Sequence, residues 1–305
     1  MNKKIGFIGQ GYIGKNYADD FEKRGINIVR YDRSKKYSKN RKEIEKCDIV
    51  FVAVPTPTTP SGFDDSIVRS VLSIPKKGAS VVIKSTILPG ATESMQEENP
   101  NLYIMHSPEF LTMVRASEDA ASPNRNIIGI PKNTAEYRKR AQEVIDTLPK
   151  APYEKICTAK EAEFIKYGGN NWGYMKVVYI NMLYDLTERH GCDWNVMKEA
   201  MAADPRIGSA WMSPLHESGH KNNKKGYKFN DYHLEPVHKT GRGAGGHCFI
   251  KDFEAFLQMY EREVSDDLGV TALEAVRNKN LDLLIQTGKD INLLEGVYGD
   301  LSDRK

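Results

Sequence analysis

The first half of this 305-residue chain alternates short apolar, β-branched runs with stretches of helical spacing. The apolar runs predict strands at residues 4–8, 26–31, 49–54, 81–84, 102–106 and 127–130. Helical spacing predicts helices at residues 12–24 and 134–148. Strands that alternate with helices are typical of parallel strands joined by right-handed crossovers. The pattern therefore predicts an α/β fold, with a doubly wound parallel sheet covered by helices on both faces.

After about residue 158 the pattern becomes mostly helical. Residues 159–190 show one long helical period, with apolar positions such as Ile165, Val177 and Ile180. Further helices are predicted at residues 195–203, 253–260 and 270–287. The part between them is rich in Lys, Asn, Gly and His and predicts a long loop, with an insertion at about residues 209–240. We therefore expect two domains, residues 1–158 and residues 159–305, the second built on a long central helix.

Composition and charge exclude some classes of partner. The chain has 44 Lys and Arg against 41 Asp and Glu, a net charge of +3, which does not indicate nucleic acid or an anionic membrane as a main partner. No apolar run approaches the roughly 18 to 20 residues that a bilayer span needs. Its cysteines are far apart and form no Cys-x-x-Cys pair: Cys47, Cys157, Cys192 and Cys248. These features predict a soluble protein of the reducing cytoplasm.

A glycine motif follows the first predicted strand. Gly9, Gly11 and Gly14 stand where that strand meets the first helix, so the helix N-terminus can offer free N–H groups to a pyrophosphate. Asp32 ends the second strand, 18 residues after the last glycine, where a carboxylate can bind an adenosine ribose. The motif thus predicts a Rossmann-like NAD site. A tight turn without a ligand is the alternative.

Basic residues beside Asp32 leave the choice of dinucleotide open. The carboxylate would repel the 2′-phosphate of NADP and favours NAD. Arg33, Lys35 and Lys36 follow it directly and could attract that phosphate.

Two further loops follow strand ends, at residues 54–58 and 85–90. Ligands of open parallel sheets lie beyond the carboxyl ends of the strands, so both loops are expected to line the cofactor site. Each could equally be an ordinary proline-containing turn.

The segment 241–252 carries the strongest indication of chemistry. Its glycines permit close backbone approach to a substrate, and a helical pattern starts just after Cys248. A thiol near a helix N-terminus and basic groups ionises more easily, and the thiolate is the nucleophile. A small buried cysteine before a helix explains the same residues.

On the long helix, Lys166 and Asn170 stand four residues apart and share one face. They could serve one site. Gly168 and Gly169 lie between them and suggest that something approaches this backbone closely, although helix packing explains the glycines as well.

Taken together, these segments resemble the UDP-glucose/GDP-mannose (nucleotide-sugar) dehydrogenase family. Their order and approximate spacing agree with the family from residue 1 to about residue 260. The matching segments are GQGYIG (9–14), VPTPT (54–58), ST with PG (85–90), SPEFL (107–111), residues 161–170, DPRIG (204–208) and CFIKD (248–252). The resemblance implies oxidation of a sugar's primary alcohol to a carboxylate in two hydride transfers, as in UDP-glucose 6-dehydrogenase, with two NAD consumed.

The resemblance also implies how the reaction is divided among residues. Cys248 matches the nucleophile, which captures the intermediate aldehyde as a thiohemiacetal and becomes a thioester that water cleaves. Lys166 and Asn170 match residues that stabilise negative charge on the substrate oxygen.

Three further matches concern water and protons. Asp252 matches a carboxylate that positions water and assists proton movement, and Glu109 matches one implicated in thioester hydrolysis. Thr86 matches a residue that helps to order the active-site water.

Contacts to ligands are implied in the same way. The cofactor contacts would be Gly9, Gly11, Tyr12, Ile13, Gly14, Asp32, Val54, Pro55, Thr56, Pro57, Ser85, Thr86 and Lys251. The substrate contacts would be Glu109, Phe110, Leu111, Lys166, Asn170, Arg206, Gly243 and Gly245. Arg206 matches an arginine that reaches the neighbouring subunit's sugar site, so a homodimer built on the long helix is implied.

The chain also departs from the family pattern. Met113 and Val114 replace a usual glutamate and glycine, Ala244 replaces an aromatic residue, and His247 stands where a small residue is common. The 53 residues after Asp252 are too few for the family's third, nucleotide-holding domain.

We therefore hypothesise that the basic segment 216–242 binds a phosphate or diphosphate in place of that domain; the alternative is a solvated loop. The pair His216 and His220 has a zinc-like spacing, but its glycine-containing loop context predicts no metal site.

Two other functions remain open at this point. One is a β-hydroxyacid or 6-phosphogluconate-like dehydrogenase, which uses no cysteine. The other is an inactive NAD-binding scaffold protein.

Overall fold

The computed structural model describes residues 3–112, 115–217, 240–264 and 266–302. The chain forms two compact units. The first unit comprises Met1–Thr56 and Asp64–Lys166, and the second comprises Pro57–Phe63 and Tyr167–Lys305. Most of the basic segment, residues 218–239, lies outside the described residues, as do Met113 and Val114. That residues 1–158 and 159–305 form two separate domains stays a prediction.

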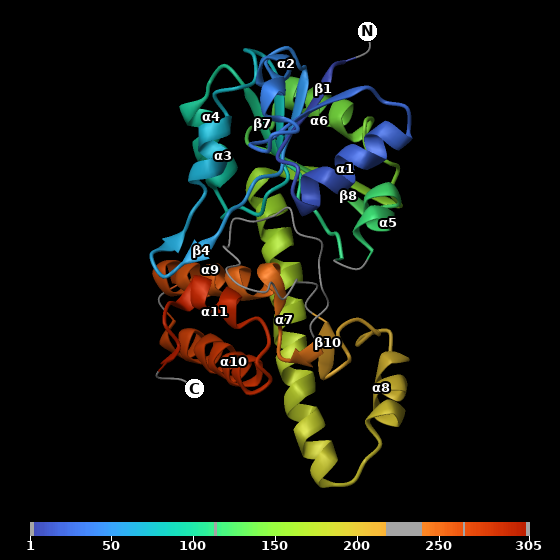
Figure 1. Cartoon of the computed structure of the whole chain (residues 1–305), viewed down its shortest axis with the longest axis vertical. Helices are drawn as coiled ribbons and strands as arrows, with labels where there is room; N and C mark the ends of the chain where they lie inside the picture. The colour runs from blue at the N-terminus through green and yellow to red at the C-terminus, as the bar shows by residue number, and fades with distance from the viewer. Residues whose placement is uncertain (1–2, 113–114, 218–239, 265, 303–305) are drawn as a thin grey trace. The chain divides into compact units, whose positions relative to one another are not determined.

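The first unit is built on a sheet of seven strands (Figure 1). The strand order is β2-β1-β3-β6-β7-β8-β9. The strands are β1 (Ile5–Ile8), β2 (Ile28–Tyr31), β3 (Ile49–Val52), β6 (Ser80–Ile83), β7 (Tyr103–His106), β8 (Arg125–Ile130) and β9 (Tyr153–Thr158). The predicted doubly wound α/β sheet is therefore confirmed.

One feature of the predicted sheet is wrong, because the sheet is mixed. The pairs from β2 to β7 are parallel, but β8 is antiparallel to β7, and β9 runs parallel to β8. The sequence also gave no prediction for β9. Its side chains are mostly half-buried or exposed and include Glu154 and Lys155, so no continuous apolar run indicates a strand.

Helices cover both faces of the sheet, as predicted (Figure 1). On one face lie α1 (Tyr12–Lys23), α5 (Ala116–Ala121) and α6 (Ala135–Ile145). On the other lie α2 (Arg41–Ile44), α3 (Ser66–Val71) and α4 (Ala91–Glu98). A short 3₁₀ helix, η1 (Ser38–Asn40), directly precedes α2. Alternate residues of each strand point to each face.

Aromatic rings fill the core beneath α1. The ring of Phe7 on β1 stacks on that of Phe51 on β3 at a centroid distance of 4.9 Å. Phe21 of α1 meets both rings edge-on, at 5.2 and 5.6 Å. Burying such rings is worth about 2 to 3 kcal/mol each, so this contact fixes α1 against the central strands.

The second unit is mainly helical. The helices are α7 (Ala159–Arg189), whose first turns belong to the first unit, α8 (Trp194–Ala202), α9 (Gly246–Val264), α10 (Asp267–Gln286) and α11 (Ile291–Tyr298). Two short hairpins complete it: β4 (Thr58–Thr59) with β5 (Gly62–Phe63), and β10 (Leu215–Glu217) with β11 (Thr240–Arg242). The predicted long central helix is confirmed.

A glycine sets how closely α9 packs on α7. A Cβ added at Gly173 would lie 2.7 Å from the ring of Phe249, so any side chain at that position would push α9 away. One residue further along α7, the ring of Tyr174 stacks on Phe253 at 3.9 Å. The α9 helix starts at Gly246, before the predicted helix at residues 253–260 and before the helical pattern expected just after Cys248. Cys248 therefore lies within the first turn of α9.

Candidate active site

The glycine motif forms a tight turn between β1 and α1. Gly9 has a φ of +91°, and a Cβ there would lie 2.1 Å from the carbonyl oxygen of Ala53. A Cβ at Gly14 would lie 2.0 Å from the carbonyl oxygen of Gly9. Gly11 is the N-cap of α1 and offers no side chain that would compete for the first N–H groups. The turn therefore has the shape that a pyrophosphate requires, at a helix N-terminus whose N–H groups favour an anion.

Strand order places this turn at a topological switch point. From β1 the chain continues to β2 on one side, and then crosses to β3 on the other. A ligand of such a sheet binds in the crevice beyond the carboxyl ends of β1 and β3, where Gly9 and Ala53 lie.

A buried arginine supports the turn, and the sequence did not indicate it. Gln10 donates from Nε2 to the carbonyl oxygen of Gly9 at 3.0 Å, and its Oε1 accepts from Nη1 of Arg30 at 3.2 Å. Arg30 also pairs with Asp19 and Glu22 of α1, at 2.7 Å each. The turn is thus tied to both β2 and α1.

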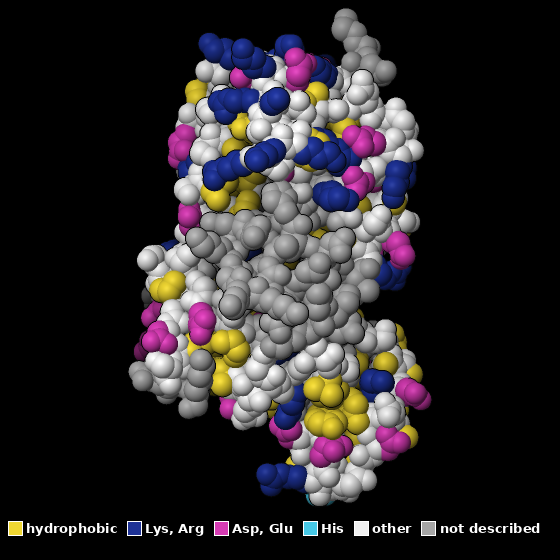
Figure 2. Space-filling model, viewed as in Figure 1, with side chains coloured by type: hydrophobic (Ala, Val, Ile, Leu, Met, Phe, Trp, Pro, Cys, Tyr) yellow, Lys and Arg dark blue, Asp and Glu magenta, His cyan; other side chains and the backbone are white. Residues whose placement is uncertain are grey.

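Asp32 lies just after β2, as predicted, and its carboxylate accepts hydrogen bonds from the N–H (2.7 Å) and Oγ of Ser34. Arg33, Lys35 and Lys36 beside it are exposed. Figure 2 shows many Lys and Arg side chains over the first unit. A carboxylate held at this strand end fits a ribose of NAD.

The two predicted cofactor loops are linked by hydrogen bonds. Ser85 accepts from the N–H of Val54 at 2.9 Å and donates to its carbonyl oxygen at 2.7 Å. Thr56 donates from Oγ1 to the carbonyl oxygen of Thr86 at 2.7 Å. The first unit therefore contains Val54, Pro55 and Thr56 together with Ser85 and Thr86. The boundary between the units follows Thr56, so Pro57 belongs to the second unit.

Glu109 and Lys166 form a buried ion pair in the first unit. Nζ of Lys166 lies 2.7 Å from Oε1 of Glu109 and donates to the carbonyl oxygen of Glu109 at the same distance. Their side chains are only 4 and 5% exposed. The other carboxylate oxygen accepts from the N–H of Leu111 at 2.8 Å, so both oxygens of Glu109 are oriented.

The ring of Phe110 lies near two cations of the first unit. Its ring centroid is 3.7 Å from the guanidinium of Arg125 and 5.9 Å from Nζ of Lys166. Three predicted substrate contacts, Glu109, Phe110 and Leu111, thus occupy the loop after β7, and Lys166 of α7 contacts this loop.

A second buried lysine, Lys84, stands at the end of β6. It donates to the carbonyl oxygen and Oγ of Ser107, at 3.2 and 3.0 Å, and lies 4.3 Å from the centroid of the Tyr17 ring. Burial lowers the pKa of Lys84 to about 7, and the neighbouring Lys166 adds to the shift although Glu109 opposes it. Burial likewise lowers the pKa of His106 to about 3. The only sequence signal for Lys84 was a charged residue at the end of an apolar run.

The second unit holds a separate cluster around Asp252. This carboxylate is fully buried, accepts from Nδ2 of Asn170 at 2.6 Å, and pairs with Nζ of Lys251. The carbonyl oxygen of Lys251 accepts from Oγ1 of Thr58 at 3.0 Å. Cys248 is exposed and lies four residues before Asp252 on α9, so both project from one face of the helix.

Lys166 and Asn170 each contact a different buried carboxylate. Lys166 contacts Glu109 in the first unit, and Asn170 contacts Asp252 in the second. Arg206 lies on the surface with 88% of its side chain exposed and pairs with Asp204 at 2.6 Å. Gly243 and Gly245 lie in the buried loop before α9.

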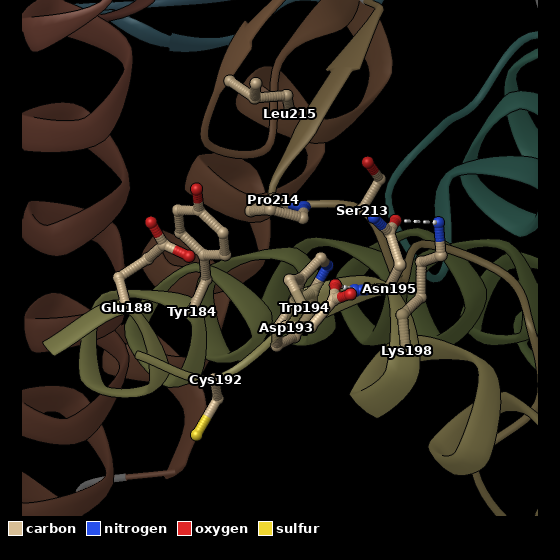
Figure 3. A pocket seen from close by; sticks show the side chains of 10 residues that line it. All are labelled: Tyr184, Glu188, Cys192, Asp193, Trp194, Asn195, Lys198, Ser213, Pro214 and Leu215. Atoms are coloured by element: carbon tan, nitrogen blue, oxygen red, sulfur yellow. Dashed lines mark hydrogen bonds between the residues drawn. The ribbon is translucent and has the colours of Figure 1, made fainter. Parts of the chain in front are cut away.

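A cavity of about 350 Å³ opens in the second unit (Figure 3). It lies where α7 ends and α8 begins, and its walls include Tyr184, Trp194 and Leu215. None of the predicted site residues lines it. Among the described residues we find no group of three His, Cys, Asp or Glu side chains that could hold a metal ion. His220 lies outside them. No helix in the described ranges is long and apolar enough to cross a membrane.

The fold and the glycine turn define an NAD-binding α/β protein, and comparison with known families is more specific. Residues 33–148 match the NAD binding domain of the UDP-glucose/GDP-mannose dehydrogenase family, and residues 160–232 match the central domain of that family. The chain belongs to the UDP-glucose/GDP-mannose dehydrogenase family. The predicted resemblance and the predicted cofactor, NAD, are thereby confirmed.

Curated relatives agree with this assignment. A UDP-glucose 6-dehydrogenase of Rickettsia bellii is 27% identical over 276 residues, which cover 87% of this chain and 56% of the relative. A UDP-glucose 6-dehydrogenase of Rhizobium meliloti is 29% identical over 224 residues, which cover 69% of this chain and 45% of the relative. The chain thus spans about half the length of these relatives.

Solved structures show the same fold. A UDP-glucose dehydrogenase of Pyrobaculum islandicum superposes with a TM-score of 0.70 at 24% identity, covering 91% of this chain and 68% of the other. A UDP-D-ManNAc dehydrogenase of Pyrococcus horikoshii gives a TM-score of 0.71 at 20% identity, covering 93 and 69%.

Lys84 should make stability depend on pH. Its pKa is about 7 in the folded protein against 10.5 in an unfolded chain, so between these values unfolding takes up a proton. The free energy of unfolding should therefore rise with pH in this window, by at most about 1.4 kcal/mol per pH unit. Urea titrations of wild type and Lys84→Met from pH 7 to 10 measure this. The slope should be smaller in Lys84→Met and unchanged in Lys132→Met, an exposed control; equal slopes in all three proteins would contradict the assignment.

Proposed function

We propose that this protein is an NAD-dependent dehydrogenase that oxidises the primary alcohol of a nucleotide sugar, of the UDP-glucose type, to a carboxylate through a covalent intermediate on Cys248. The observation that carries the proposal is the cluster in the second unit, where an exposed thiol stands one helical turn from a buried carboxylate with two nitrogen donors. Family membership and the names of the relatives support the substrate class.

The proposed reaction has three parts. The alcohol loses a hydride and a proton to become an aldehyde, and the Cys248 thiol adds to that aldehyde to form a thiohemiacetal. Loss of a second hydride and proton converts the thiohemiacetal to a thioester. Water then cleaves the thioester, which releases the acid and restores the thiol. NAD, when bound, accepts one hydride in each oxidation.

Each polar side chain has a proposed role that its contacts can support. Lys166 and Asn170 stabilise negative charge on the substrate oxygen, since an ammonium and an amide N–H are both strong donors. Asp252 accepts protons and positions water, and its pairing with Asn170 and Lys251 holds its oxygens in place. Glu109 and Thr86 assist the water that cleaves the thioester.

The ligand contacts are proposed as follows. The cradle of Gly9, Gly11 and Gly14, with Tyr12 and Ile13 at the start of α1, would hold the pyrophosphate of NAD, and Asp32 its ribose. The remaining cofactor contacts would be Val54, Pro55, Thr56, Pro57, Ser85, Thr86 and Lys251. Sugar contacts would come from Glu109, Phe110, Leu111, Lys166, Asn170, Arg206, Gly243 and Gly245.

The stoichiometry of NADH tests the proposal. Purified protein is incubated with NAD and a panel of nucleotide sugars and sugar phosphates, and NADH and acid are both measured. We expect two NADH per acid, a loss of roughly a hundredfold or more in Cys248→Ser, and nearly unchanged turnover in Cys192→Ser, the control at another exposed cysteine.

Other outcomes assign other functions. One NADH per product, with no effect of Cys248→Ser, identifies a hydroxyacid-type dehydrogenase that makes no covalent intermediate. NAD binding without turnover on the whole panel identifies a scaffold protein. Either result contradicts the proposal.

We further propose a homodimer through α7. Large apolar side chains are spaced three and four residues apart along one face of this helix and are 41–60% exposed: Trp172, Met175, Tyr179, Met182 and Leu186. Gly168 continues the same spacing, and a Cβ there would meet nothing within 4 Å. A Cβ at the neighbouring Gly169 would likewise meet nothing of the described chain within 4 Å. We therefore propose that α7 of a second copy of this chain packs on this face.

Charge on this face should prevent dimerisation. The double variant Tyr179→Glu, Met182→Glu places carboxylates where the second helix would pack, so its molar mass should fall to that of a monomer in sedimentation equilibrium. Val196→Glu, at an exposed apolar position on α8, serves as the control and should stay dimeric. A monomeric wild type at micromolar concentration, or a dimeric double variant, would exclude this interface.

A further inference from the structure

The glycine-rich loop before Cys248 is held by side chains that follow it in the sequence. Lys289, in the turn between α10 and α11, is fully buried and donates to the carbonyl oxygens of Gly241 and Gly243, at 3.4 and 3.0 Å. The next residue, Asp290, accepts from the N–H of Gly246 at 2.8 Å. The loop backbone is therefore fixed at both ends by two adjacent residues.

The middle of the loop is held in the same way by α10. The buried side chain of Asn280 accepts from the N–H of Ala244 at 2.6 Å and donates to the carbonyl oxygen of Ala244 at 3.0 Å. We call Asn280, Lys289 and Asp290 the loop clamp.

The loop clamp explains why the loop has glycines at three positions where the sequence suggested close approach of a substrate. A Cβ on Gly245 would lie 2.2 Å from Oδ2 of Asp290 and 2.7 Å from Cε of Lys289. A Cβ on Gly241 would lie 2.8 Å from Cβ of Lys289. Gly243, with a φ of +86°, lies against Asn280 and α10. The protein's own side chains thus occupy the space beside all three glycines.

The loop clamp lowers the stability of the fold in two ways that a purely structural contact would avoid. The neighbouring parts of α10 and α11 contribute to an apolar cluster with Leu281, Leu284 and Leu293, which another apolar side chain could extend. Instead the protein buries an ammonium group, and this burial lowers the pKa of Lys289 to about 8. Asp290 moreover has a φ of +55°, which is unfavourable for a residue with a Cβ.

The clamp acts on the part of α9 where Cys248 lies. Gly246 is the first residue of α9, and Cys248 is the third. N–H groups in the first turn of a helix favour a nearby negative charge, such as that of a thiolate. The position of this turn and the charges next to it therefore influence the reactivity of the thiol.

We propose that Lys289 and Asp290, together with Asn280, are positioning residues that hold the first turn of α9 in the geometry in which Cys248 reacts. The role of Cys248 as nucleophile rests on the proposed function. The clamp itself predicts an effect on thiol reactivity that can be measured without any sugar substrate.

The two charged members of the clamp should have opposite effects. Lys289→Met removes a positive charge and the donors to two carbonyl oxygens, and both changes disfavour the thiolate. Asp290→Asn keeps an acceptor for the N–H of Gly246 but removes a negative charge from the start of the helix. A contact that served only to stabilise the fold would give the same sign for both variants.

The experiment measures the rate at which iodoacetamide alkylates Cys248 at pH 7, with peptide mass spectrometry to separate Cys248 from Cys192. We expect alkylation to be about two- to fivefold slower in Lys289→Met and at least as fast as wild type in Asp290→Asn. Lys279→Met, which loses an ion pair with Asp282 on the surface of α10, is the matched control and should not change the rate. The dissociation constant of NAD should stay within about twofold in all variants, because all its proposed contacts except Pro57 and Lys251 belong to the first unit.

Slower alkylation in both clamp variants, or an unchanged rate in Lys289→Met, would overturn the proposal. If Lys289→Met does not fold, Asp290→Asn decides alone, because it keeps the size and the acceptor of the native side chain; slower alkylation in that variant refutes the clamp. Opposite effects on alkylation without any NADH formation would uphold the clamp and refute the proposed function. Two NADH per acid in the wild type, with alkylation unchanged in the clamp variants, would support the proposed function and refute the clamp.

Discussion

Two buried carboxylates impose the main constraint on this molecule, because a buried charge is unstable unless nitrogen donors meet it. Glu109 is met by Lys166, and Asp252 by Asn170 and Lys251. Lys166 and Asn170 stand four residues apart on α7, so one unbroken helix supplies a donor to each carboxylate. Removing Lys166 would leave the buried charge of Glu109 without its cation, at a cost of about 3 to 5 kcal/mol. Asp252 would keep Lys251 if Asn170 were removed.

The same demand for donors explains the start of α7 and the glycine turn. Thr158 and Glu161 exchange hydrogen bonds at the first turn of α7, which fixes where the helix begins. In the turn after β1, backbone N–H groups at the start of α1 offer donors to an anion in place of a side chain. Polar groups at the edges of regular elements therefore prepare the sites at which charged ligands would bind.

Much of this could be predicted from the sequence, because glycines, strand runs and helical periods are local signals. The glycine turn, Asp32 and the long helix all follow from spacing along the chain. Strand direction does not, since an apolar run is the same in either direction, and the reversal of β8 was therefore missed. The early start of α9 was missed because glycines hid its first turn.

Contacts between distant residues were equally inaccessible. Lys84 and Lys289 read as ordinary lysines, and only the fold shows that they are buried against backbone carbonyl oxygens. The glycines of residues 241–245 were interpreted as permitting close approach of a substrate, and the structure shows that Asn280, Lys289 and Asp290 lie where a Cβ would stand. A sequence shows that a glycine is needed, but not which neighbour requires it.

The central claim, a covalent intermediate on Cys248, is tested most directly by trapping it. In Glu109→Gln the cleavage of the thioester should be slow, so the protein is mixed with NAD and an active nucleotide sugar and is quenched in acid. Mass spectrometry should then find the acyl group of the sugar acid on the peptide that contains Cys248. NADH formation with no modified peptide, or an acyl group on another cysteine, would contradict the account.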